Sequence, residues 1–237
     1  MPDPTAATSM RPYARTTGVV YLLYFVTAIV GALCAKGLVV YDAAAATARN
    51  ILAHEFSYRL SFSVSLIANA FYVALVVLLY ELFRPVSRRL ALLAISFGLI
   101  GCTVQVAATV FQLAPLVFFS GGNRYLQVFP TEQLQAMTLA LLRFEVQAFT
   151  VGLVFFALFC LFVGYLIYIS TFLPGVLGVL LMLAGVGWLT YLWPPAADSF
   201  SHVIQPIGFL AELAFMLWLI TRGVDMQRWS ELAARKA

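Results

Sequence analysis

The chain has 237 residues, of which 63% are hydrophobic and only 10% are charged. A soluble domain of this size could not cover so much apolar surface with polar groups, so the composition excludes an ordinary soluble protein. The formal net charge of +4 comes from short basic clusters beside apolar runs, which argues against a nucleic-acid-binding surface.

Six apolar runs approach or exceed the roughly 20 residues needed to cross the hydrocarbon core of a bilayer. They predict an all-α, polytopic membrane protein with a six-helix transmembrane bundle over 17–222. A cytoplasmic segment (1–16) precedes the bundle, and a cytoplasmic amphipathic tail (223–237) follows it. The expected spans are about 17–36, 60–83, 90–119, 134–170, 173–193 and 201–221.

Proline and glycine mark the expected ends of these helices. Arg84-Pro85 ends the second helix, because proline cannot continue the backbone hydrogen-bond ladder. Gly121-Gly122-Asn123 signals a turn after the third, and Pro130 directly precedes the fourth. Pro194-Pro195 closes the fifth.

The loop between the first two spans, 42–59, predicts an extra interfacial helix. Asp42 is expected to cap its start, and Ile51, Leu52 and Phe56 recur at helical spacing. Such a helix would lie on the outer leaflet. It would serve either as a surface anchor or as a lid over a cavity.

Basic residues in short loops predict that both termini are cytoplasmic, because they are retained on that side of the membrane. One side of a six-span arrangement carries Arg11, Arg15, Arg84, Arg88, Arg89, Arg222, Arg228, Arg235 and Lys236. The other side carries Lys36, Arg49, Arg59 and Arg124, with Arg143 farther along the fourth helix.

Glu212, near the middle of the last span, is the ionisable residue expected closest to the bilayer midplane. Burial disfavours a charged carboxylate, so a neutral carboxyl is expected there unless a cation lies close. Asn69 and Gln105 have similar expected depths on two other helices, which predicts a polar layer. The layer would be either a functional site or a set of interhelical hydrogen bonds.

Two stripes of small and polar residues run outward from this layer, on the third and sixth spans. They comprise Gly98, Gly101, Gln105, Ala108 and Gln112, and Ser201, Gln205, Gly208 and Glu212. Arg143, Glu145 and Gln147 are expected at the outer interface, with Glu145 pointing away from the other two. The stripes predict either an outward-facing cavity roofed by the 42–59 helix or ordinary close packing.

Motifs for metals and cofactors are weak. Cys34, Cys102 and Cys160 lie inside apolar segments, and His54, Glu55, Glu145 and His202 lack metal-ligand spacing. We therefore expect no metal and no cofactor. No nucleophile motif, phosphate loop or dinucleotide fingerprint is present, which favours a non-catalytic protein without deciding the question.

Several passages resemble the bacterial membrane family known as domain of unknown function 4386. They are ARTTGVVYLL (14–23), NILAHEFSYRL (50–60), LYELFRPVSRRLALL (79–93), the segment 152–187 with GYLIYISTFLPGVLGVLLMLAG, and ELAFMLWLITRG (212–223). The resemblance implies six or seven membrane helices in a bacterial cytoplasmic membrane, and interest in Glu55, Arg59 and Glu212. Relatives tend to carry arginine where this chain has Gly98 and histidine where it has Phe159.

Three functions are compatible with these patterns. The first is a regulatory or sensing protein that binds a lipid or other apolar ligand, with Glu212, Gln105, Asn69, Gln112, Gln205, Arg143, Glu145, Glu55 and Arg59 as candidate ligand-binding residues. The second is an intramembrane enzyme that acts on a lipid or isoprenoid, with Glu212 as general acid. The third is a proton-coupled transporter, with Glu212 as the proton carrier. The expected partners are the lipid bilayer and the ligand, and the oligomeric state stays open.

Overall fold

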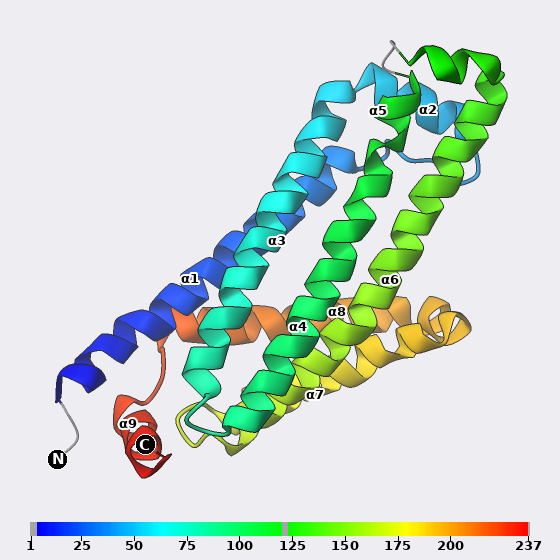
Figure 1. Cartoon of the computed structure of the whole chain (residues 1–237). Coiled ribbons are helices and arrows are strands. Elements are labelled where there is room, and N and C mark those ends of the chain that lie inside the picture. Colours follow the sequence, from blue (N-terminus) through cyan, green and yellow to red (C-terminus); the bar gives the residue numbers. More distant parts are fainter. Residues whose placement is uncertain (1–3, 120–122, 237) are drawn as a thin grey trace. The chain divides into compact units, whose positions relative to one another are not determined.

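The computed structural model describes residues 4–119 and 123–236, with residues 4–11, 124, 194, 196–198, 235 and 236 described by backbone alone. The described chain is helical, without a strand (Figure 1). Its elements are α1 (Pro4–Ala35), α2 (Ala44–Ala53), α3 (Glu55–Phe83), α4 (Arg88–Ala108), η1 (Thr109–Leu113), α5 (Ala114–Phe119), η2 (Arg124–Val128), α6 (Thr131–Ile169), α7 (Gly175–Leu189), η3 (Thr190–Leu192), α8 (Pro194–Thr221) and α9 (Met226–Lys236).

Within the described ranges, six stretches are long and apolar enough to cross a membrane, which confirms the predicted all-α, multi-pass class. They are Pro12–Ala35, Glu55–Phe83, Arg88–Phe119, Thr131–Ile169, Gly175–Leu192 and Ser199–Thr221. Several helices begin earlier than the apolar runs suggest. The last membrane-spanning helix, α8, starts at Pro194. Proline is well tolerated in the first helical turn, where its missing N–H breaks no bond.

The chain forms two compact units. The first unit comprises Met1–Leu23, Phe71–Cys102 and Val151–Ala237, and the second comprises Tyr24–Ala70 and Thr103–Thr150. The long helices α1, α3, α4 and α6 each contribute one end to each unit. The helices α7, α8 and α9 belong to the first unit, and α2, α5, η1 and η2 to the second.

Small residues let helices of the first unit approach closely. A side chain on Gly178 of α7 would overlap the backbone oxygen of Gly164 on α6, and one on Gly185 would come within 2.9 Å of the Ala157 oxygen. The helices α7 and α8 pack side by side (Figure 1), where Gly208 leaves room for the indole of Trp188. These glycines therefore serve close helix packing.

Glycines on α4 serve the same purpose within the first unit. A side chain on Gly98 would come within 3.0 Å of the Phe159 ring, and one on Gly101 would come within 3.0 Å of the Gly152 oxygen. Gly98 and Phe159 thus pack against each other, at the two positions where the resemblance implies an arginine and a histidine. This part of the predicted α4 stripe is an apolar packing surface.

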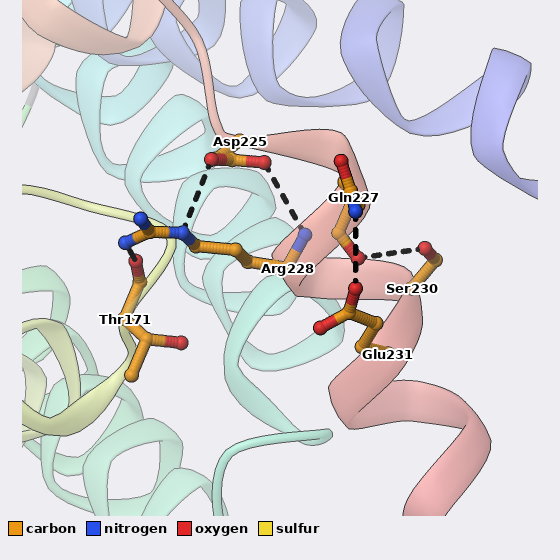
Figure 2. A network of polar contacts seen from close by, with 6 residues as sticks. All are labelled: Thr171, Asp225, Gln227, Arg228, Ser230 and Glu231. Carbon is orange, nitrogen blue, oxygen red and sulfur yellow. Dashed lines mark hydrogen bonds and ion pairs between the residues drawn. The ribbon is translucent and has the colours of Figure 1, made fainter.

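The C-terminal helix α9 is joined to the α6–α7 loop by a polar network (Figure 2). The Asp225 carboxylate accepts a hydrogen bond from the Arg228 backbone N–H (3.2 Å), which caps the start of α9, and lies 3.4 Å from the Arg228 side chain. The Arg228 guanidinium also donates to the Thr171 carbonyl at 2.8 Å. Within α9, the Gln227 side-chain amide donates to the carboxylate of Glu231, one helical turn farther along the chain.

The loop that receives these contacts contains a strained residue. Thr171 has a φ of +58°, a region that β-branched residues seldom occupy. Its neighbour Phe172 is buried, stacks on Phe83 and accepts a hydrogen bond from the Asp225 backbone N–H. The indole of Trp229 donates to the Leu82 carbonyl at 3.0 Å, so α9 also secures the end of α3.

We predict that Arg228 stabilises the strained conformation of Thr171. Arg228→Gln should lower the free energy of unfolding by about 1 kcal/mol, because it removes a charge-assisted hydrogen bond to the loop. The loss should be smaller in a Thr171→Gly background, since glycine adopts positive φ without strain. Chemical unfolding in mild detergent measures both changes. Arg222→Gln, an equal change of charge at the exposed end of α8, is the control, and strictly additive effects would contradict the coupling.

Candidate functional site

The second unit encloses a partly open cavity of about 380 Å³. One group of lining side chains is polar and the other is apolar. The polar group is Tyr41, Tyr58, Ser61, Gln112 and Glu145, and the apolar group is Ala35, Val39, Leu142, Val146 and Phe149, with Gly37 beside them. A volume of this size lies within the range of small-molecule sites in proteins.

The segment after α1 forms one wall of this cavity. Gly37 has a φ of +77°, which lets the chain turn sharply where α1 ends. The Thr47 hydroxyl then donates to the Val40 carbonyl at 2.9 Å and lies 2.8 Å from the Val40 N–H, which donates to it. These two bonds fix Val40 against α2 and place Val39 and Tyr41 at the cavity.

The helix α2 covers the apolar core of the second unit. Its Ile51 is fully buried and belongs to a cluster with Leu38, Tyr58, Leu116 and Leu142. The helix also packs on α5 (Figure 1). No residue of α2 is among those that line the cavity, and the predicted 42–59 helix contributes only Tyr58, at the start of α3, to its lining.

The predicted cap and the predicted extent of this helix are wrong. Asp42 does not cap it: the N-cap position is Ala43, which makes no side-chain hydrogen bond, and Asp42 is fully exposed. The chain turns at His54, and Phe56 therefore belongs to α3. Ile51 is buried within the unit, whereas Leu52 and Phe56 are exposed, at 39% and 79%.

A chain of hydrogen bonds joins three elements that carry polar lining residues: α3, η1 and α6. The Tyr58 hydroxyl of α3 donates to the Gln112 carbonyl at 2.8 Å, and the Gln112 side-chain amide donates to the Glu145 carboxylate at 2.6 Å. Gln112 lies in η1, the 3₁₀ turn that precedes Pro115. Proline has no N–H for the Phe111 carbonyl, which accepts a hydrogen bond from Ala114 instead.

Arg143 anchors the loop beside the cavity. Its guanidinium donates to the Tyr41 carbonyl at 2.6 Å and lies 3.8 Å from the Asp42 carboxylate. Arg143 itself is not a lining residue, because residues two apart on a helix point in different directions. Partial burial, and secondarily the charge of Glu145, raise the pKa of the Tyr41 phenol above its ordinary value. Tyr41 therefore stays neutral at physiological pH.

Other predicted site residues of the second unit lie elsewhere. Glu55 and Arg59 form an exposed ion pair with each other, 2.7 Å apart, one turn apart on α3. The Asn69 amide donates to the Ser65 carbonyl of its own helix, and Gln105 is half-buried on α4. None of these four residues lines the cavity.

Two further candidates belong to the first unit. Gln205 is exposed on α8 and donates to the Tyr191 hydroxyl at 3.2 Å. Glu212 is buried and accepts a hydrogen bond from the Tyr21 hydroxyl at 2.9 Å. Tyr21 also contacts Phe215 edge to face. The predicted layer of Asn69, Gln105 and Glu212 therefore combines residues of both units.

Sequence reasoning missed Tyr41, Tyr58 and Ser61. A signal for the last two was present, because Tyr58, Ser61, Ser65 and Asn69 recur every three or four residues along one face of α3. Tyr41 had no such signal, since its position depends on the turn at Gly37. In the part of the chain that the structure describes, no three histidine, cysteine or acidic residues are grouped to hold a metal ion.

The sequence model of the family described as "Domain of unknown function (DUF4386)" matches residues 16–223. The chain therefore belongs to this family, and the match extends over all six stretches that could span a membrane, save the first residues of the first. No curated protein and no solved structure matches the chain.

We predict that the bond between Tyr21 and Glu212 is structural. Tyr21→Phe should lower the free energy of unfolding by about 1 kcal/mol, because it leaves a buried carboxyl without this donor. Phe25→Leu, an apolar change on the same helix, is the control for altered packing. Thermal unfolding in mild detergent gives the stability, and an unchanged stability of Tyr21→Phe would contradict the prediction.

Proposed function

We propose that this member of the DUF4386 family binds a lipid or another amphiphilic small molecule in the cavity of its second unit and has a sensing or regulatory role. The observation that carries the proposal is that the cavity is lined by both polar and apolar side chains. An amphiphile needs both, because its head group requires hydrogen-bonding partners and its tail requires apolar contacts.

Hydrogen bonds within the protein hold the polar lining residues in place without a ligand. Tyr58 fixes the backbone of Gln112, and Gln112 fixes one oxygen of Glu145. Arg143 and Thr47 fix the loop that carries Tyr41. Preorganised polar groups lower the entropy that binding costs, so this arrangement favours a specific ligand over general lipid contact.

The enzyme and transporter hypotheses both depend on Glu212. That carboxyl lies in the first unit, accepts a hydrogen bond from Tyr21 and is not among the residues that line the cavity. The carboxylate that does line it is Glu145. A binding role therefore accounts for more of the observed contacts than either alternative.

The basic residues support a location in the bacterial cytoplasmic membrane with both termini in the cytoplasm. In that orientation the loop at Asp42 faces the outside and the turn at Arg88 faces the cytoplasm. The ligand would then enter from the outer leaflet or from the space beyond it.

Cysteine labelling tests this orientation. In a variant whose three cysteines are replaced by alanine, Asp42→Cys should react with a membrane-impermeant maleimide on intact cells. Arg88→Cys should react only after the cells are opened, although both positions are exposed. The reverse pattern would place the termini outside and contradict the proposed orientation.

Filling the cavity tests the proposed function. Ser61→Phe should abolish retention of a bound amphiphile, because Ser61 lines the cavity and a phenyl ring would occupy it. Ser63→Phe, on the exposed side of the same helix, is the matched control and should retain the ligand. Native mass spectrometry in mild detergent measures what each protein retains.

A defined ligand on wild type and Ser63→Phe, absent from Ser61→Phe, supports the proposal. The same unspecific lipids on all three proteins would refute it. Thermal unfolding of each variant checks that the folds are equally stable.

A further inference from the structure

We infer that the cavity selects a cationic amphiphile, with an ammonium head group against Glu145 and an alkyl body against the apolar lining residues. The inference rests on the proposed function and specifies its ligand class. Its basis is the charge and hydrogen-bond capacity of the lining residues.

Glu145 gives the cavity its charge. No lysine, arginine or histidine is among the lining residues, and the other polar groups there are two phenols, a hydroxyl and an amide. Only one oxygen of the Glu145 carboxylate, Oε1, has a hydrogen-bond partner among the described residues. The second oxygen can therefore accept a hydrogen bond from a ligand.

Among the described residues, Glu145 forms no ion pair with a lysine or an arginine. Arg143 is two residues away on α6, but its guanidinium donates to the Tyr41 carbonyl and faces Asp42. The two phenols near Glu145, Tyr41 and Tyr58, supply no positive charge. In a partly desolvated site, an unneutralised carboxylate favours a cation and opposes an anion.

Aromatic rings strengthen this preference. Tyr41, Tyr58 and Phe149 line the cavity together with Glu145. The face of an aromatic ring attracts ammonium groups, and the attraction grows when both partners are shielded from water. Val39, Leu142 and Val146 offer the remaining apolar surface for an alkyl chain.

Two sources can supply this chemistry: a free alkylamine and a lipid whose head group carries an amine. Both carry an ammonium group and an apolar chain, which in the lipid are separated by a glycerol and a phosphate. Decylamine and lysophosphatidylethanolamine represent the two sources in the experiment below.

The test measures binding of three ten-carbon probes to the full-length protein in mild detergent at pH 7. Decylamine is cationic, decanol is neutral and decanoate is anionic. Isothermal titration should give the order decylamine, then decanol, then decanoate for wild type. Glu145→Gln should weaken decylamine binding by about tenfold or more and leave decanol binding unchanged, because it removes the charge and keeps the shape.

Glu132→Gln is the matched control, since Glu132 is an exposed acid on the same helix outside the cavity. It should bind decylamine as wild type does. Lysophosphatidylethanolamine binding more tightly than decylamine would identify a lipid head group as the source. The opposite order would identify a free amine, and either order supports a cation site.

Equal binding of decylamine and decanol by wild type, or an unchanged decylamine affinity in Glu145→Gln, would overturn the inference and leave the proposed function standing. Failure of all probes to bind wild type would overturn both. The order of the probes on wild type keeps the inference testable even if Glu145→Gln does not fold.

Discussion

The structure depends on one constraint: polar groups that leave water for a membrane must find partners within the protein. The backbone meets this constraint by forming helices, in which each N–H and carbonyl is paired inside one segment. Hydroxyl side chains follow the same rule on a smaller scale. Thr17, Ser96, Thr150 and Thr221 each donate to a carbonyl four residues earlier in their own helix.

The constraint is hardest to meet where a helix ends or changes its geometry. At those places carbonyls lose their usual partners, and side chains of other elements supply new ones. In the part of the chain that the structure describes, such contacts include Tyr58 to the Gln112 carbonyl, Arg143 to Tyr41, Arg228 to Thr171, and Trp229 to Leu82. The first two hold the cavity of the second unit, and the last two hold the C-terminal junction of the first unit. Irregular parts of the chain are thus places where distant segments are joined.

The same physics decides what the sequence could reveal. The six spans were predictable because a helix that crosses the hydrocarbon core must be apolar and must be long enough to match the thickness of that core. Gln112 and Glu145 were candidates because they are polar residues in apolar segments, but their contact with each other depends on how α6 is rotated. The Asp42 cap failed because the helix starts one residue later than that cap requires: Ala43 is the N-cap and Ala44 the first helical residue, and Asp42 lies near Arg143 instead. The exact first residue of a short helix leaves no periodic pattern in a sequence.

The two carboxylates show why membrane depth is an incomplete guide to function. Glu212 drew attention because a carboxyl at the midplane is costly, yet cost alone does not distinguish a structural group from a binding group. Glu212 is buried and accepts a hydrogen bond from Tyr21, whose ring contacts Phe215. Glu145 has one oxygen held by Gln112 and borders a cavity with room for a ligand. Since a binding carboxylate needs both an available oxygen and adjacent space, Glu145 is the stronger candidate.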